Sequence, residues 1–190
     1  MKRILVFGDA HVPSRADSIP AGFYRHIHDT VYDLAIVTGD LVDESQMRAV
    51  LPPLPVCHIV QGNMDHNTDY NMHEELTVEG FALLALHGTQ LSPRGNIRQL
   101  NEIAHRTGSD IVIHGHTHVP SVELYDAVLF LNPGTITGAT GGWGGRKDAS
   151  FIELEISESE VSVTLFVTDW TSEHRSVTKY KKVDRGIVMA

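Results

Sequence analysis

Three short apolar runs in the first third of the chain constrain its fold more than any other feature. They cover residues 2–7, 32–37 and 56–60, and each is followed within two residues by a glycine and then a polar side chain. Residues 21–30 and 43–51, which separate the runs, are predicted to be helical. Strands that alternate with helices predict a largely parallel sheet, in which functional side chains gather at the carboxyl ends of the strands.

The second half of the chain predicts more antiparallel structure. Residues 94–107 have helical periodicity, and Gly108 follows as a stop signal. The predicted strands are residues 75–78, 81–86, 111–113, 122–125, 128–131, 151–156 and 161–167. We therefore expect an α/β fold, a four-layer sandwich of two mixed β-sheets packed face to face and flanked by helices.

Two segments have no such pattern. Residues 137–147 are rich in glycine and are expected to form a loop. The tail from about residue 169 is polar with scattered apolar residues, so it could add an edge strand, contact a partner chain or remain loose.

Length and charge limit the classes of protein to consider. The chain has 190 residues, which corresponds to a single domain over residues 1–190. Its formal net charge of −9 argues against unspecific binding to nucleic acid or to anionic membranes. The one cysteine, Cys57, cannot form an internal disulfide, and no apolar run approaches the ~20 residues of a membrane span. A cytoplasmic protein that does not associate with membranes is expected.

Polar clusters follow five of the apolar runs. They are Asp9 with His11, Asp40, Asn63, His87, and His116 with His118. Two metal ions that lie close together need a shared anionic ligand and several further donors, and this set is sufficient if Asp40 bridges. Mixed carboxylate, amide and imidazole ligands suit Mn²⁺, Fe or Zn²⁺, and the absence of cysteine disfavours a structural zinc site.

Five segments together resemble the calcineurin-like metallophosphoesterases over roughly residues 1–156. The segments are Gly8-Asp9-Ala10-His11, Gly39-Asp40-Leu41-Val42-Asp43, Gly62-Asn63-Met64-Asp65, His87-Gly88 and Gly115-His116-Thr117-His118. Short length, Asn132-Pro133-Gly134-Thr135 and the Gly-Arg segment after it are most similar to the small bacterial and archaeal phosphodiesterase branch. The family fold, two mixed sheets between helices, agrees with the prediction above.

The resemblance also implies a ligand set and a reaction. Asp9, His11 and His118 would hold one ion, Asn63, His87 and His116 would hold the other, and Asp40 would bridge them. The expected cofactors are two divalent ions, Mn²⁺ first, with Zn²⁺, Fe or Ni²⁺ as alternatives. The implied activity is hydrolysis of a small phosphodiester by in-line attack of a metal-bridging hydroxide, with Asp40, Asn63 and Asp65 as the catalytic residues.

The chain departs from the family pattern at Met64. Many members have a histidine there, which pairs with the following aspartate to protonate the leaving group, and methionine cannot do this. We therefore expect activated esters or diesters to be hydrolysed in preference to alkyl monophosphates. His66 is a candidate replacement, although a solvated loop histidine would look the same.

Four further residues carry smaller expectations. Asp43 either supports the site or begins a helix, and His114 is a strand residue or a support for the ligands. Arg146 and Trp143, on the glycine-rich loop, are candidates to cover a substrate, although such loops also serve as plain connections.

Two other functions stay open at this stage. A non-catalytic scaffold is one, because the retromer coat subunit resembles the same family; that subunit departs from the ligand pattern at the first histidine, which is present here as His11. A metal-dependent nuclease is the other, and the acidic charge argues against it. The expected partners are a small phosphate-ester substrate and further copies of the chain in a dimer or tetramer, without nucleic acid.

Overall fold

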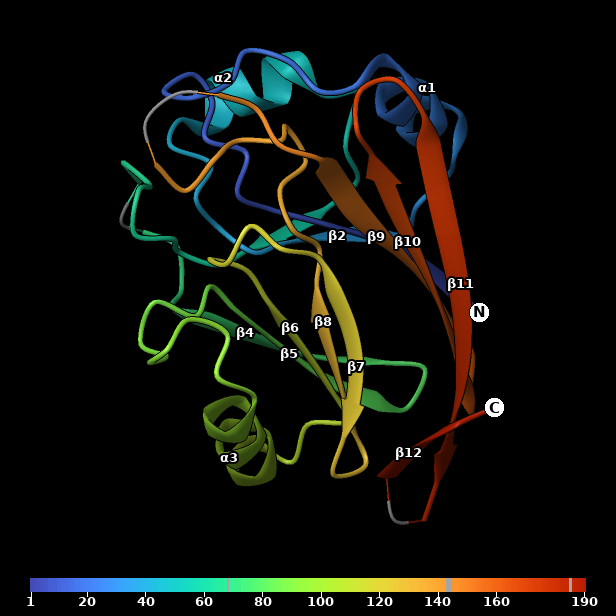
Figure 1. Cartoon of the computed structure of the whole chain (residues 1–190). Helices are drawn as coiled ribbons and strands as arrows, with labels where there is room; N and C mark the ends of the chain where they lie inside the picture. Colours follow the sequence, from blue (N-terminus) through green and yellow to red (C-terminus); the bar gives the residue numbers. More distant parts are fainter. Residues whose placement is uncertain (68, 143–144, 185) are drawn as a thin grey trace.

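Two mixed β-sheets form the centre of the protein (Figure 1). The computed structural model describes residues 1–67, 69–142, 145–184 and 186–190. Within these residues the first sheet has the strand order β12-β11-β10-β9-β1-β2-β3. Its strands are β1 (Lys2–Phe7), β2 (Leu34–Val37), β3 (Cys57–Ile59), β9 (Ala149–Ile156), β10 (Glu160–Thr168), β11 (Glu173–Val183) and β12 (Gly186–Met189).

The second sheet has the strand order β4-β5-β6-β8-β7. Its strands are β4 (His73–Val78), β5 (Phe81–Leu86), β6 (Ile111–His114), β7 (Ser121–Tyr125) and β8 (Val128–Asn132). Each sheet has a parallel part: β1, β2 and β3 run parallel at one end of the first sheet, and β5, β6 and β8 run parallel in the centre of the second. The remaining strand pairs are antiparallel.

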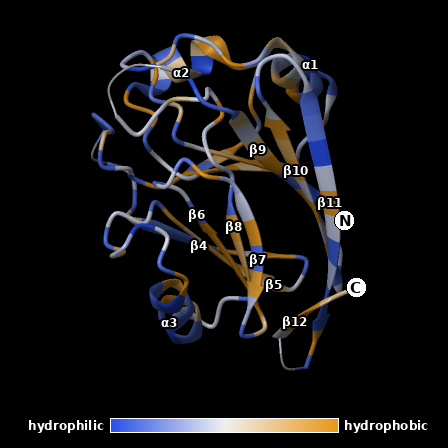
Figure 2. Cartoon of the chain, viewed as in Figure 1, coloured by the Kyte–Doolittle hydropathy of each residue, from blue (hydrophilic) through white to orange (hydrophobic). Residues whose placement is uncertain are grey.

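The main hydrophobic core lies between the two sheets. Ile4, Val6 and Ile36 face it from the first sheet, and Ile111 and Ile113 face it from the second, all without measurable exposure. Figure 2 shows the same division, with hydrophobic residues along the strands of both sheets. Burial of these side chains contributes about 25 cal/mol for each Å² of apolar surface removed from water, so this layer holds the sheets together.

Helices cover the outer faces of both sheets. The helices α1 (Ala21–Asp29) and α2 (Glu44–Val50) pack on the first sheet through Phe23 and Met47, and α3 (Ile97–Thr107) packs on the second through Leu100. The layers therefore run helix, sheet, sheet, helix (Figure 1), which confirms the predicted sandwich. None of the described helices combines the length and the apolar character that a membrane crossing requires.

The polar tail forms the edge of the first sheet. β11 pairs antiparallel with β10 from Glu173 to Lys181, and β12 pairs with the end of β11. The N–H of Ile187 also donates to the carbonyl of Ala127, at 2.7 Å, in the turn between β7 and β8. Of the three alternatives left open by the sequence, the edge strand is therefore the one observed.

Candidate metal centre

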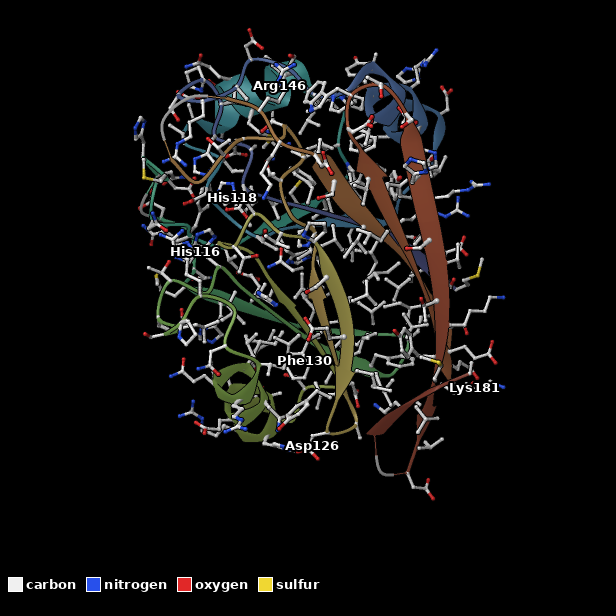
Figure 3. All side chains as sticks on the ribbon, viewed as in Figure 1. His116, His118, Asp126, Phe130, Arg146 and Lys181 are labelled. Carbon is white, nitrogen blue, oxygen red and sulfur yellow. The ribbon has the colours of Figure 1, made fainter. Side chains whose placement is uncertain are left out.

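Loops at the carboxyl ends of five strands converge at one end of the sandwich. Those after β1, β2 and β3 belong to the first sheet, and those after β5 and β6 to the second. Figure 3 shows His116 and His118 in this region, between the two sheets. The side chains form two groups that share Asp40, and within each group the ligand atoms lie within 4.8 Å of one another. The first group is Asp9, His11, Asp40 and His118, and the second is Asp40, His87 and His116.

The first group holds buried polar atoms without hydrogen-bond partners. His118 Nε2 lies 3.2 Å from His11 Nε2 and 3.4 Å from Asp9 Oδ1, and His11 Nε2 lies 3.5 Å from Asp40 Oδ2. Asp9 and His11 are fully buried, and in the described residues neither Asp9 Oδ1 nor His11 Nδ1 has a hydrogen-bond partner. Because an unpaired buried carboxylate is costly, a cation bound among these atoms fits the site.

The second group adds an amide oxygen. His87 Nε2 lies 3.1 Å from His116 Nδ1, 3.3 Å from Asn63 Oδ1 and 3.5 Å from Asp40 Oδ2. Asn63 is exposed, whereas the other side chains of this group are buried, so Asn63 marks the solvent side of the centre. The structure thus brings together all seven candidate ligands, and their grouping corresponds to the two sets that the family resemblance implies. That these residues bind metal ions stays a prediction.

The backbone of these loops is strained where the ligands project. Five ligands adopt left-handed backbone angles, a conformation that residues other than glycine rarely adopt. The φ values are 47° at Asp9, 49° at His11, 54° at Asp40, 69° at His116 and 56° at His118. Strain of this kind persists only where the surrounding contacts impose it, and here it coincides with the candidate centre.

Gly62 and Gly115 lie directly against the centre and leave no room for a side chain. A Cβ on Gly62 would lie 2.2 Å from the backbone N of Asp40, and one on Gly115 would lie 2.9 Å from Asp9 Oδ2. Both distances are shorter than real Cβ contacts, so these positions require glycine. The glycines that follow the predicted strands therefore allow the ligand loops to approach one another.

Hydrogen bonds fix the orientation of two histidine ligands. The Nδ1 of His87 donates to the carbonyl of Thr38, and the Nδ1 of His118 donates to the carbonyl of Ala139, each at 2.7 Å. With Nδ1 as the donor, the lone pair lies on Nε2, which is the atom that faces the other ligands. In both rings Nε2 is therefore the nitrogen with a lone pair available to a metal ion.

Asn132 and its neighbours support the ligand loops, a role that the sequence analysis missed. Its Nδ2 lies 3.2 Å from the carbonyl of Gly115 and 3.1 Å from the ring of His114. The hydroxyl of Thr135 donates to the carbonyl of Asp9 at 2.8 Å. The sequence Asn132-Pro133-Gly134-Thr135 is one of the segments that resemble the phosphoesterase family. Its residue types alone do not reveal that Asn132 and Thr135 hydrogen-bond to the loops of the candidate ligands.

Asp65 joins two of the loops. Its carboxylate accepts backbone N–H groups from Asp40 at 3.0 Å, Leu41 at 2.6 Å, Val42 at 2.9 Å and Gly62 at 2.7 Å. These bonds use both carboxylate oxygens and hold the loop of Asp40 against the loop of Asn63. The structure therefore gives Asp65 a positioning role, while the direct part in catalysis expected for it stays a prediction.

Burial controls the protonation of the centre. Burial raises the pKa of Asp9 to about 7 and lowers the pKa of His11 to about 3 and of His116 to about 4. Burial alone would also raise the pKa of Asp40, but hydrogen bonding and charge from His87 outweigh it, and the pKa falls to about 2. At neutral pH the site thus presents an ionised Asp40 with neutral imidazoles at His11 and His116, the forms that bind divalent ions.

The side chain at the position of the missing histidine borders a cleft. Met64 donates its backbone N–H to Asp40 Oδ1 at 2.7 Å, and its side chain is 38% exposed. The cleft has a volume of ≈ 570 Å³, which is enough for a small ligand. Its lining residues are Ser14, Arg15, Met64, Thr140 and the glycines at 141, 142 and 145.

The remaining predicted residues lie outside the ligand set. Asp43 caps α2 by accepting the N–H of Gln46 at 3.0 Å, and His66 is exposed. The guanidinium of Arg146 stacks on the ring of Trp170, 3.9 Å from its centroid. Trp143, the other residue expected to cover a substrate, lies outside the described residues.

Comparison with known proteins agrees with the ligand geometry. The profile of the calcineurin-like phosphoesterase superfamily domain matches residues 1–159. A probable metallophosphoesterase of Methanothermobacter thermautotrophicus is 32% identical over 134 residues, which cover 70% of this chain and 76% of that protein. The resemblance drawn from the five segments is therefore confirmed.

Solved structures of similar proteins share the fold. Vps29 of Entamoeba histolytica, in a crystal structure complexed with Zn²⁺, is 28% identical with a TM-score of 0.83, over 93% of this chain and 98% of that one. A single mutant of the same Vps29 is 30% identical with a TM-score of 0.82, over 92% and 98%. Vps29 of Chaetomium thermophilum is 23% identical with a TM-score of 0.85, over 96% and 100%. The chain belongs to the calcineurin-like phosphoesterase superfamily.

Proposed function

We propose that the protein is a phosphodiesterase that depends on two divalent metal ions and hydrolyses small phosphodiesters. One observation carries the proposal: Asp40 is shared by two groups of buried ligands, in the arrangement that a two-ion hydrolytic centre needs. Mn²⁺ is the first choice for the ions, with Zn²⁺, Fe or Ni²⁺ as alternatives. The Zn²⁺ in the similar Vps29 structure supports zinc binding as one of these.

Each ligand group would hold one of the two ions. Asp9, His11 and His118 would hold one ion, Asn63, His87 and His116 would hold the other, and Asp40 would bind both. The ions would supply positive charge at the phosphoryl oxygens and a hydroxide nucleophile at neutral pH. The chain itself keeps the imidazoles of His11 and His116 neutral, and backbone carbonyls orient the Nε2 atoms of His87 and His118. Asn63 lies at the solvent side, where a substrate would arrive.

Met64 determines which leaving groups are accepted. Its thioether has no proton to donate, so a leaving oxygen next to it must depart as the anion or take a proton from solvent. Loss of a general acid typically costs ~10²–10⁴-fold, and the cost is greatest for poor leaving groups. We therefore expect aryl diesters to be hydrolysed faster than alkyl monophosphates at matched metal concentration. Faster hydrolysis of the alkyl monoesters would contradict this.

Metal reconstitution tests the proposed function. Metal-stripped protein would receive Mn²⁺, Ni²⁺, Zn²⁺ or Mg²⁺ singly, and hydrolysis of bis-p-nitrophenyl phosphate would be followed. We expect turnover that depends on the added ion and that Asp40→Asn and His116→Ala both abolish. Turnover that survives in the metal-stripped protein, or in both variants, would refute the two-ion mechanism.

A protein-interaction scaffold is the second candidate. The chain is similar to Vps29 over almost its whole length, which favours this candidate. Proteins that share a fold need not share an activity, so the fold alone does not make this chain an enzyme. Binding of two ions without turnover of any phosphoester would support the scaffold over the enzyme.

The cytoplasmic location and the dimer or tetramer remain predictions, and the unpaired Cys57 supports a reducing compartment.

A further inference from the structure

Two arginines converge on the rim of the cleft beside the metal centre. Arg15 is part of the cleft lining, and its Nη1 donates to the carbonyl of Thr140 at 3.0 Å. The Nη1 of Arg94 lies 4.0 Å from the point that a Cβ on Gly141 would occupy. Thr140 and Gly141 are consecutive, with Cα atoms about 3.8 Å apart, so both guanidinium groups lie beside the same short piece of chain.

No carboxylate oxygen of the described residues lies within 4.0 Å of Arg15 or Arg94. Arg48, by contrast, pairs with Glu44. Other exposed arginines, such as Arg98, also have no carboxylate partner in the described residues, so the distinguishing feature of Arg15 and Arg94 is their shared position at the rim of the cleft. The chain contains 24 acidic and 15 basic side chains, so carboxylates are not scarce. Two like charges gathered at one rim repel each other unless an anion lies between them.

The two arginines also border different halves of the metal centre. The backbone N–H of Arg15 donates to the backbone carbonyl of His11, a candidate ligand of the first group, at 2.9 Å. Arg94 precedes Gly95, where an added Cβ would lie 3.0 Å from Cγ2 of Thr117, the residue next to His116 of the second group. The arginines therefore lie where the part of a substrate next to the scissile phosphoryl group would extend into the cleft.

We infer that Arg15 and Arg94 bind a second phosphate group of the substrate, so that the preferred substrates are phosphodiesters that carry a further terminal phosphate. The inference rests on the proposed function, because it concerns the cleft of the same centre. The metal ligands suffice for the scissile phosphoryl group, which leaves both guanidinium groups for another anion. Their planar, multiple N–H donors match phosphate oxygens.

A matched pair of substrates tests this clamp of Arg15 and Arg94. Thymidine 5′-(p-nitrophenyl phosphate) and the same compound with a 3′-phosphate have the same scissile bond and leaving group. We expect the 3′-phosphate to raise kcat/KM at least about tenfold, mainly through a lower KM, as a charge-assisted bidentate contact would. Arg15→Gln and Arg94→Gln should each reduce this ratio toward one. Arg98→Gln, an equal charge change at an exposed position in the first turn of α3, should preserve it.

A binding measurement separates the clamp from the activity. Isothermal titration calorimetry on metal-free protein would compare thymidine 3′,5′-bisphosphate with thymidine 5′-monophosphate. We expect tighter binding of the bisphosphate, with the difference lost in Arg15→Gln and Arg94→Gln and kept in Arg98→Gln. Equal binding of the two nucleotides, or a difference that both arginine variants retain, would overturn the clamp even if the enzyme is active. Absence of hydrolysis with an intact binding difference would instead refute the proposed function and retain the clamp.

Discussion

Asp40 is the residue on which both halves of the candidate centre depend. Its Oδ2 lies 3.5 Å from His11 Nε2 and 3.5 Å from His87 Nε2, one in each group. Its Oδ1 accepts the N–H of Met64, which fixes the rotation of the carboxylate. A single carboxylate therefore links two sets of imidazoles that other loops supply.

This sharing predicts different metal contents for different variants. His118→Ala should lose the ion of the first group and His116→Ala that of the second, because each removes one group's ligand. Asp40→Ala should lose both ions. Inductively coupled plasma mass spectrometry on dialysed, folded protein would measure the ratios. Retention of both ions by Asp40→Ala would show that the carboxylate does not bridge.

Asp9 makes metal binding dependent on pH. Burial raises the pKa of Asp9 to about 7, so the metal-free protein keeps a proton there below neutral pH, and a binding ion must displace it. The pKa of His87 is also raised: burial lowers it, but the hydrogen bond and charge of Asp40 outweigh burial. Affinity should therefore fall about tenfold or more per pH unit below 7 and level off above it. Calorimetry in buffers of different ionisation enthalpy would count the released protons, and Asp9→Asn should release fewer.

The elements contribute through the loops at their ends, and Asp65 is the main link between two of these loops. Because its carboxylate accepts four backbone N–H groups, Asp65→Asn should lower the free energy of unfolding by about 2 kcal/mol in metal-free protein. Asp69→Asn, at an exposed position in the same segment, should change it by no more than about 0.5 kcal/mol. Urea denaturation would measure both, and equal effects would argue against the positioning role.

Most elements could be predicted from periodicity, because their buried faces are strongly apolar. β1 and β5 have the predicted bounds, and α3 begins three residues later than predicted because Asn96 caps it, accepting the N–H of Arg98 at 3.1 Å. β11 could not be predicted: it lies near the edge of the sheet, beside the short strand β12, and its residues are mostly exposed, with only Tyr180 buried among them. Without a buried face a strand has no hydrophobic alternation to detect.

The candidate site could be predicted as a set of ligands but not as a structure. The ligands stand directly after apolar runs, which the sequence displays. The supports are backbone carbonyls, such as those of Thr38 and Ala139, or come from remote segments, as Asn132 does. A carbonyl belongs to every residue alike, so its use as an acceptor leaves no mark on the sequence.

At the scale of the whole molecule, buried neutral histidines make the metal-free protein sensitive to acid. Burial lowers the pKa of His11 to about 3 and those of His114 and His116 to about 4, and it also lowers the pKa of His118. The unfolded chain therefore binds more protons between pH 4 and the usual histidine value of about 6.5. Stability rises with pH in this window and is lost as the pH falls.

Asp9 and His87 have the opposite effect on stability, because their pKa values are raised in the folded protein, which therefore binds their protons more strongly than the unfolded chain. These two groups are outnumbered by the four histidines with lowered pKa values. We expect the free energy of unfolding of metal-free protein to be lower at pH 4.5 than at pH 6.5 by about 2 kcal/mol. Urea denaturation at the two pH values would measure the difference. Equal or greater stability at pH 4.5 would show that these imidazoles are not held neutral in the fold.

The candidate centre takes its ligands from both sheets, and this division has a mechanical consequence. Asp9, His11, Asp40 and Asn63 follow strands of the first sheet, while His87, His116 and His118 follow strands of the second. Bound ions would cross-link the two sheets, since sliding one sheet over the other would separate the two sets of ligands. Metal affinity therefore depends on how well the two sheets pack, and a substitution that loosens the distant core between them should lower it.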